Sequence, residues 1–310
     1  MENTFKYYSS GKFLLSGEYL VLDGAKSIGL PCNLGQTMEL RTQAGSGQLI
    51  WESYTKDDKL WQACTLDVKD LQIVSFMDIA FAERLQQVIQ ACLDLGASPL
   101  DPAKDYLFKT QLEFDPAWGL GSSSTFIANI SRHFKIDPYQ LLAKTFGGSG
   151  YDIAAANANK AFYYQLEGGV PKTESIDFNP EFRSVLFFVY LNQKQNSRSG
   201  IKSYKSVTKN KDLYINKVSS ISEAMASTDD LAQFSNLIEQ HENLVSDLMG
   251  MPVVKDRLFQ DFEGAVKSLG AWGGDFVLVC SSKGSEYINQ YFEDKGYEVI
   301  LPYDQIIKHQ

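Results

Sequence analysis

The chain has 310 residues, of which 44% are apolar and 22% charged, and its formal net charge is −9. These values are ordinary for a globular protein with one large or two medium domains. The negative charge, with no Lys/Arg cluster to offset it, argues against a nucleic-acid surface, and no stretch approaches the length that spans a membrane. The scattered cysteines lack metal-ligand spacing and indicate reduced thiols in a cytoplasm; they are Cys32, Cys64, Cys92 and Cys280.

The first 70 residues predict strands and turns. Strands are expected over 27–32, 37–42, 48–54 and 61–68, and Asp23-Gly24 is a hairpin signal. An amphipathic helix should follow over 76–95, with Gly96 at its C-terminal end.

Residues 11–24 combine two charged residues with an apolar run, Gly-Lys-Phe-Leu-Leu-Ser-Gly-Glu-Tyr-Leu-Val-Leu-Asp-Gly. Lys12 can supply a cation near a substrate oxygen or a phosphate. The other interpretation of Lys12 is an exposed lysine at a strand edge. The role of Glu18 is equally open, because a carboxylate at a strand end can simply order the turn.

A glycine- and serine-rich loop lies between a strand pattern over 106–114 and a helix pattern that begins near Phe126. Gly119 and Gly121 let the backbone turn tightly, and the first N–H groups of the helix attract anions. Ser122, Ser123 and Ser124 add hydroxyls for phosphate oxygens or Mg²⁺. The alternative is an ordinary loop with a serine N-cap. The loop fits neither the Walker motif, which needs a lysine after the second glycine, nor the dinucleotide fingerprint.

A second glycine turn, residues 147–150, leads into a helix that carries Asp152 in its first turn. The helix dipole favours an ionised carboxylate at this position. Such a carboxylate can accept a hydroxyl proton during phosphoryl transfer, although a helix-capping aspartate is the simpler interpretation. Just before this turn, Asp137-Pro138 predicts the start of another helix.

The second half alternates strand and helix patterns. Gly168-Gly169 is a candidate domain boundary after a strand over 161–165, and a buried strand is expected over 184–191. Helices are predicted over 214–225, 229–249 and 253–268, then a glycine loop, a buried strand, a helix over 286–294 and a strand over 297–301. The glycine loop, Gly270-Ala271-Trp272-Gly273-Gly274, can let the backbone approach phosphates.

Three of these segments resemble, in order, the motifs of the GHMP kinases, named for galactokinase, homoserine kinase, mevalonate kinase and phosphomevalonate kinase. Residues 11–24 are similar to the first motif and residues 267–279 to the third. Residues 116–124 resemble the second, Pro-x-x-x-Gly-Leu-Gly-Ser-Ser. The departures are small: Pro116 is one residue closer to the glycine, and Ser124 and Trp272 replace the usual alanine and glycine.

The resemblance implies an α+β fold with two domains and an active site in the cleft between them. The N-terminal GHMP kinase domain, with the phosphate loop and the catalytic Asp, would cover 1–170, and a ferredoxin-like C-terminal domain would cover 171–310. The implied reaction transfers the ATP γ-phosphoryl group to a small acceptor with the help of Mg²⁺. Asp152 would be the base, Lys12 would steady the acceptor oxygen, and Ser123 would bind Mg²⁺. The ATP phosphates would be held by Gly119, Leu120, Gly121, Ser122, Ser123, Ser124, Gly273 and Gly274.

Phosphomevalonate is the favoured acceptor, because Gly17-Glu18-Tyr19 and the alanines after Asp152 resemble phosphomevalonate kinases most. Mevalonate kinases use a glutamate shortly before the catalytic Asp as a second Mg²⁺ ligand, and residues 131–151 contain none. The alternatives are mevalonate kinase or another GHMP kinase, diphosphomevalonate decarboxylase and a non-catalytic ligand-sensing relative. The decarboxylase usually has alanine where Gly121 stands. Whether the protein is a monomer or a homodimer stays open.

Overall fold

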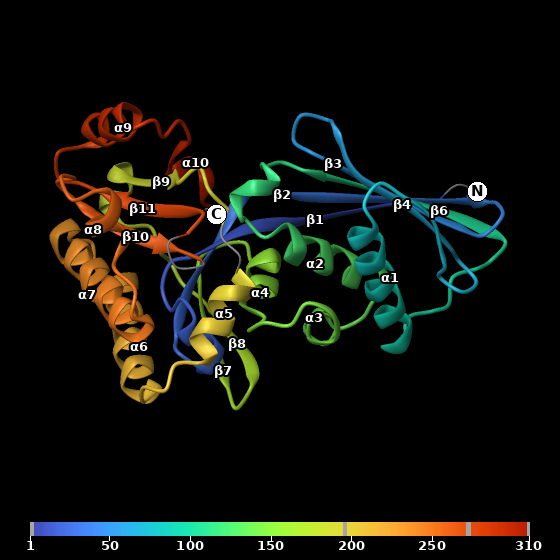
Figure 1. Cartoon of the computed structure of the whole chain (residues 1–310), viewed down its shortest axis with the longest axis horizontal. Coiled ribbons are helices and arrows are strands. Elements are labelled where there is room, and N and C mark those ends of the chain that lie inside the picture. Colours follow the sequence, from blue (N-terminus) through green and yellow to red (C-terminus); the bar gives the residue numbers. More distant parts are fainter. Residues whose placement is uncertain (1–2, 195–196, 271–273, 309–310) are drawn as a thin grey trace. The chain divides into compact units, whose positions relative to one another are not determined.

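In a computed structural model of the chain (Figure 1), residues 3–194, 197–270 and 274–308 are described. The chain forms two compact units, each discontinuous in sequence. Unit 1 comprises Met1–Gly11, Leu34–Pro116 and Leu120–Asn157, and unit 2 comprises Lys12–Asn33, Ala117–Gly119 and Ala158–Gln310. They are discontinuous because two long strands, β1 (Asn3–Leu14) and β2 (Ser27–Ala44), have residues in both units. The functional division into 1–170 and 171–310 stays a prediction.

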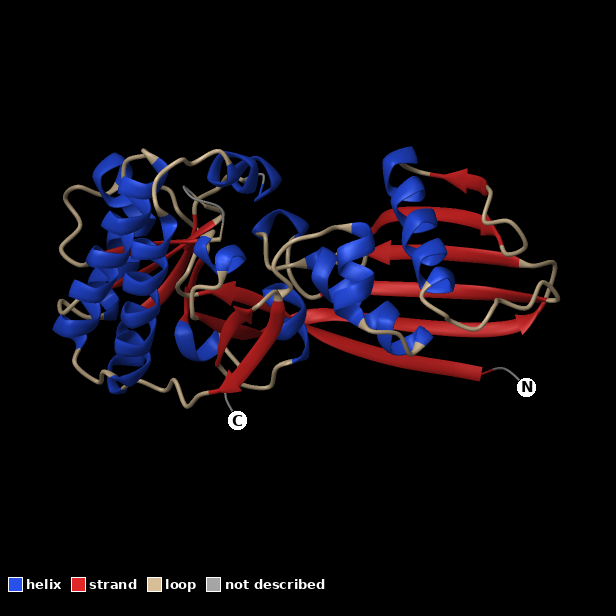
Figure 2. Ribbon diagram, turned by 90° about the horizontal axis from the view of Figure 1, so that it is seen from below, coloured by secondary structure: helices blue, strands red, loops and turns tan. Residues whose placement is uncertain are grey.

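Unit 1 is built on a mixed sheet whose strands run in the order β5-β4-β3-β6-β2, with β1 also paired to β2 (Figure 2). β3 and β6 are parallel, and the other pairs along this path are antiparallel. The added strands are β3 (Gln48–Tyr54), β4 (Leu60–Asp67), β5 (Ile73–Phe76) and β6 (Lys104–Leu112).

Four helices belong to unit 1, namely α1 (Ile79–Asp94), α2 (Ser122–Phe134), α3 (Pro138–Thr145) and α4 (Tyr151–Asn157). α1, α2 and α3 cover one face of the sheet (Figure 1). Their apolar sides bury Leu85 and Ile127 against Trp51 and Phe108, which stack on each other at 4.9 Å. The predicted cap of α3 is confirmed, because the Asp137 side chain accepts from two backbone N–H groups of its first turn.

Unit 2 contains a four-stranded antiparallel sheet in the order β10-β11-β9-β12. Its strands are β9 (Leu186–Tyr190), β10 (Ala265–Leu269), β11 (Phe276–Cys280) and β12 (Ile300–Pro302). Helix α7 (Leu231–Met249) lies between β9 and β10 in the chain and packs on β10, and α9 (Ser285–Asp294) connects β11 to β12. This β-α-β-β-α-β order confirms the expected ferredoxin-like arrangement.

The rest of unit 2 consists of a hairpin and short or surface helices. Gly168 and Gly169 form the turn between β7 (Phe162–Glu167) and β8 (Val170–Ser175), and β7 pairs with the first residues of β2. Helix α6 (Lys211–Ser227) packs on α7. The remaining elements are α5 (Ser197–Lys205), α8 (Val254–Leu258), α10 (Tyr303–Ile306) and the 3₁₀ turns η1 (Leu20–Asp23), η2 (Pro116–Trp118) and η3 (Glu181–Val185).

Three sequence predictions are wrong, for residues 253–268, for the strand β2 and for Asp23-Gly24. The helix over 253–268 is the short α8 followed by β10, whose five residues are all buried, so that no period of two marks it as a strand. The strands over 27–32 and 37–42 are one strand, β2. Asp23-Gly24 ends η1 instead of forming a hairpin, with Gly24 at φ 93°. None of the helices in the described part of the chain is apolar over the length that a membrane crossing needs.

Candidate functional site

The glycine loop has the backbone that the sequence predicts. Gly119 and Gly121 have φ values of 67° and 92°, the left-handed region that favours glycine. Gly121 is the N-cap of α2 and no side chain caps this end, so the alternative of a serine N-cap is wrong. The first N–H groups of α2, which lack partners within the helix, are therefore available at its N-terminus for an anion.

The three serines of the loop have different surroundings. Ser124 is buried, and its hydroxyl donates to the carbonyl oxygen of Gly121 at 2.8 Å. Ser123 is exposed and Ser122 is half-buried. Ser124 therefore braces the loop with its hydroxyl, whereas Ser122 and Ser123 present theirs near the surface at the start of the helix.

Asp152 lies on a helix that packs against α2 within unit 1. It is half-buried, and it stands in the first turn of α4 as predicted. Gly150, with φ 83°, makes the turn into this helix. Arg132 of α2 donates to Asn157 of α4, which holds the two helices together. The structure thus places the serine loop and Asp152 on neighbouring helices of one unit.

In unit 2, residues of all three motif segments line a cavity of about 90 Å³. Lys12 comes from β1, Gly119 from the glycine loop, and Gly270 and Asp275 from the third segment. Lys194, which the sequence analysis did not select, adds a second ammonium group. The other lining residues are Phe13, Leu14, Trp118, Leu269 and Phe276.

A glycine is required at position 119 for this packing. A Cβ there would lie 1.9 Å from Oδ2 of Asp275, so that any side chain would displace the carboxylate from the cavity wall. Gly274, predicted to contact phosphate, is buried two residues before the start of β11. Gly273 and Trp272 lie outside the described residues.

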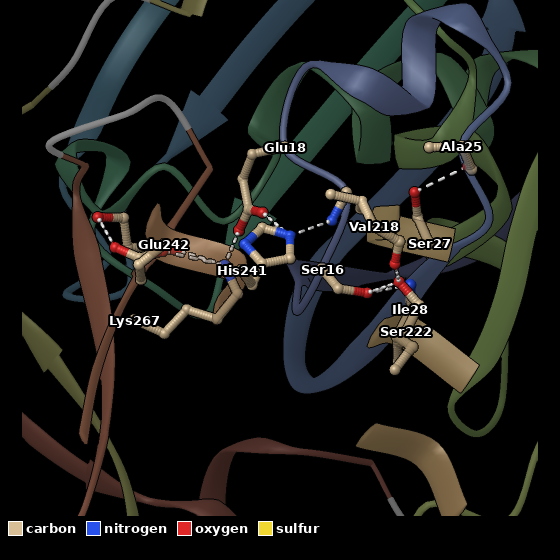
Figure 3. Close-up of polar contacts among 12 residues, drawn as sticks. Ser16, Glu18, Ala25, Ser27, Ile28, Val218, Ser222, His241, Glu242 and Lys267 are labelled. Atoms are coloured by element: carbon tan, nitrogen blue, oxygen red, sulfur yellow. Dashed lines mark hydrogen bonds and ion pairs between the residues drawn. The ribbon is translucent and has the colours of Figure 1, made fainter. Parts of the chain in front are cut away.

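Unit 2 also holds a buried polar cluster that the sequence analysis missed, formed around Lys267 of β10 (Figure 3). Its members are Glu18, His241, Glu242, Lys267 and Ser268. The sequence signal was a lysine inside a run of small and apolar residues, Ala-Val-Lys-Ser-Leu, which fits a buried strand only if the lysine has an anionic partner.

Among the described residues, no group of three or more His, Cys, Asp or Glu side chains is arranged to hold a metal ion. Mg²⁺ usually keeps several waters and binds one or two protein ligands together with substrate phosphates. The exposed hydroxyl of Ser123 beside the N-terminus of α2 fits that mode of binding. A single protein hydroxyl would suffice there if the nucleotide supplied the other ligands.

No family model matches the chain, and no curated protein is similar in sequence. Solved structures are similar over nearly the whole chain. Mevalonate kinase from Methanococcus jannaschii has a TM-score of 0.71 at 15% identity, with 99% of both chains covered. Phosphomevalonate kinase from Streptococcus pneumoniae, in complex with phosphomevalonate and AMPPNP, has a TM-score of 0.69 at 14% identity, covering 96% of this chain and 99% of the other.

Galactokinase from Lactococcus lactis, complexed with galactose, has a TM-score of 0.66 at 12% identity and covers 99% of this chain and 95% of its own. At such low identity these similarities concern the fold. They extend over both units of this chain. The chain therefore has the α+β fold of the GHMP kinases.

Proposed function

We propose that the protein is a small-molecule kinase that transfers the γ-phosphoryl group of ATP to a mevalonate-pathway acceptor, with phosphomevalonate as the first choice. The observation that carries this proposal is the cavity of unit 2, where Lys12, Gly119 and Asp275, from three separate motifs, line one small space. The fold shared with kinases of mevalonate, phosphomevalonate and galactose supports the same reaction class.

The phosphate groups would be bound by backbone N–H groups of the two glycine segments. The first segment is 119–124 and the second includes Gly273 and Gly274. The left-handed glycines and the uncapped start of α2 support the first assignment. When bound, Mg²⁺ would neutralise charge on the phosphate oxygens, with the hydroxyl of Ser123 as a protein ligand.

Asp152 is proposed to take the proton of the acceptor hydroxyl as that oxygen attacks the γ-phosphorus. Its position in the first turn of α4, directly after a glycine turn, supports this role. Lys12 is proposed to stabilise negative charge on the acceptor oxygen and on the transferred group. Its half-buried side chain at the cavity wall supports this role, because partial desolvation strengthens its field.

The charges around the cavity support an anionic acceptor. The cavity is lined by two lysines, Lys12 and Lys194, and by one carboxylate, Asp275. This arrangement suits phosphomevalonate or mevalonate better than galactose, which carries no charge. The four buried, unpaired cysteines support the further proposal that the protein works in a reducing cytoplasm.

The test is ADP release in the presence of ATP and Mg²⁺, measured with phosphomevalonate, mevalonate, diphosphomevalonate, galactose and homoserine in parallel. We expect the highest kcat/KM with phosphomevalonate. Preference for mevalonate would select the mevalonate kinase alternative, and CO₂ release from diphosphomevalonate would select the decarboxylase. Ligand binding without turnover on any acceptor would select the sensing alternative and refute the kinase proposal.

A further inference from the structure

The buried cluster of unit 2 joins the first-motif segment to α7 and β10 (Figure 3). Nζ of Lys267 donates to Oε1 of Glu18 at 2.6 Å, to the carbonyl oxygen of Ser268 at 3.0 Å and to Oε1 of Glu242 at 3.5 Å. Three acceptors thus match the three N–H bonds of the ammonium group. The exposed fractions of the Lys267, Glu18 and Glu242 side chains are 0%, 0% and 4%.

The two carboxylates of the cluster are not equivalent. Glu242 receives a donor at each oxygen, Lys267 at Oε1 and the hydroxyl of Ser268 at Oε2, the latter at 3.0 Å. Glu18 receives Lys267 at Oε1, but among the described residues no donor reaches its Oε2. Instead, Oε2 of Glu18 lies 3.2 Å from Nε2 of His241.

A backbone hydrogen bond shows whether Nε2 of His241 carries a proton. The N–H group of Gly17 donates to Nε2 of His241 at 3.0 Å, so this nitrogen carries a lone pair and the ring proton is on Nδ1. An ionised Glu18 would therefore place the lone pairs of Oε2 against the lone pair of Nε2. A proton on Oε2 converts the same contact into an O–H···N hydrogen bond that shares the Nε2 lone pair with the N–H of Gly17.

The charge balance also requires one proton on a carboxyl group of the cluster. The charged groups that face Glu18 are Lys267 of β10 and Glu242 of α7; His241 of α7 also faces it, and burial lowers the pKa of this histidine, which keeps it neutral. The ammonium group of Lys267 offsets one negative charge, so the buried cluster has no net charge when one of its two carboxyl groups is protonated. Burial raises the pKa of Glu242 as well, and the contact with Nε2 of His241 assigns the proton to Glu18. Burial raises the pKa of Glu18 to about 7, and the charge of Glu242 adds to this effect while Lys267 opposes it.

Glu18 cannot reach water by moving with its loop, because the neighbouring residues are fixed. Gly17 has φ 91°, and a Cβ there would lie 2.0 Å from Oγ of Ser27. The hydroxyl of Ser16 accepts from the N–H of Ile28 at 3.0 Å and is 2.7 Å from the hydroxyl of Ser222 on α6. The carboxyl group is therefore held at this place in the folded protein.

We propose that Glu18 is a positioning residue that acts in its protonated form, donating Oε2–H to His241 and accepting from Lys267, and that it thereby fixes the end of β1 to α7 and β10. Leu14, at the end of β1, and Leu269, at the end of β10, both line the cavity that contains Lys12. By fixing these strand ends, Glu18 would hold Lys12 in place for catalysis, and this part of the proposal rests on the proposed function. The protonation of Glu18 does not depend on the proposed function.

The decisive variant is Glu18→Gln, because a glutamine amide reproduces the protonated acid: its NH₂ can donate to His241 and its oxygen can accept from Lys267. A carboxyl group whose pKa is higher in the folded protein stabilises the fold at low pH, and this stabilisation is lost as the pH rises from 4.5 to about 7. Thermal unfolding should therefore show Glu18→Gln close to the parent at pH 5 and relatively more stable than the parent at pH 8. Glu18→Leu should lower Tm at both pH values.

Infrared difference spectra between the parent and Glu18→Gln give a direct readout. At pH 5 the parent should show the C=O band of a carboxylic acid that the variant lacks. Glu242→Gln is the matched control: removing the other negative charge should cause Glu18 to ionise beside Lys267, and the acid band should disappear. If Glu18→Gln lowers Tm as much as Glu18→Leu at every pH and no acid band is seen, Glu18 is an ordinary carboxylate and the proposal is wrong.

Kinetics test the positioning role separately. Glu18→Gln should keep kcat and lose the part of the pH profile that follows Glu18, whereas Glu18→Leu should lower kcat more than it changes KM for ATP. A parent protein that turns over no acceptor would refute the proposed function, while the infrared and unfolding measurements would still decide the protonation. Loss of kcat in Glu18→Gln, with Tm and the acid band as expected, would overturn the positioning role.

Discussion

Ser123 and Ser124 are adjacent, but their surroundings differ enough that two alanine variants separate metal binding from folding. The Ser124 hydroxyl donates to the carbonyl oxygen of Gly121 at 2.8 Å, and that oxygen also accepts from the N–H of Thr125 at 3.0 Å. Ser124→Ala thus removes one hydrogen bond without leaving the acceptor unpaired, which should cost about 1 kcal/mol of unfolding free energy. Ser123 is exposed, so Ser123→Ala should change the unfolding free energy by less than about 0.5 kcal/mol.

For turnover we expect the reverse, with the larger effect in Ser123→Ala. If the Ser123 hydroxyl is a Mg²⁺ ligand, Ser123→Ala should lower kcat at least about tenfold and raise the Mg²⁺ concentration needed for half-maximal turnover. Ser124→Ala should leave the Mg²⁺ dependence unchanged. Urea denaturation of each variant gives the unfolding free energy, and ADP release over a range of Mg²⁺ concentrations gives the metal dependence.

Three outcomes of the comparison between the two variants would refute the reasoning. A shift in Mg²⁺ dependence that follows Ser124→Ala would mean that the buried hydroxyl leaves Gly121 and binds the metal. An unchanged Mg²⁺ dependence in both variants, with wild-type kcat, would remove these hydroxyls from the metal site. Equal losses of stability would show that the exposed and buried serines are not distinguished as the structure has them.

Three further substitutions test other parts of the site and fold. Gly121→Val should abolish nucleotide binding in calorimetry, because valine is strained at φ 92°, and unchanged ATP affinity would exclude the loop from the site. Asp152→Asn should lower the single-turnover rate by about 10²–10⁴-fold with little change in Tm, and a fast but less stable variant would make Asp152 structural. Lys267→Met should lower the unfolding free energy by about 3–5 kcal/mol at pH 8 and by less at pH 5, since Lys267 holds down the pKa of Glu18; an equal loss at both pH values would contradict this. The exposed Lys283→Met is its control and should barely change stability.

Short sequence patterns correctly predicted the features that depend only on residues close together in the chain. Asp137 caps α3, and Gly119 and Gly121 adopt the left-handed backbone of a tight loop, because these features depend on residues within one turn. β10 was mistaken for a helix because all five of its residues are buried, so that no alternation of buried and exposed positions marks a strand. The partner of Lys267, Glu18, is 249 residues away, so no window of sequence could show that the lysine is paired.

The candidate site was predictable to the extent that its residues belong to motifs. Lys12, Gly119 and Asp275 share a cavity, and the first two were selected from the sequence. Lys194 was not, because it follows a buried strand without a glycine turn or a recurring pattern around it. Only the packing of unit 2 brings its side chain to the same cavity wall.

The first-motif segment carries two ionisable side chains with opposite surroundings, and this difference has a consequence for the proposed binding of an anionic substrate. Lys12 is half-buried at the cavity, whereas Glu18 is fully buried six positions later in a cluster that Lys267 connects to β10. An ionised Glu18 would give that cluster a net negative charge, and in a low-dielectric interior this charge would oppose an anionic substrate near Lys12. A protonated Glu18 still accepts from Lys267, adds a hydrogen bond to His241 and avoids that repulsion. The segment can then be held rigidly while Lys12 remains the main source of charge that the first motif contributes to the cavity.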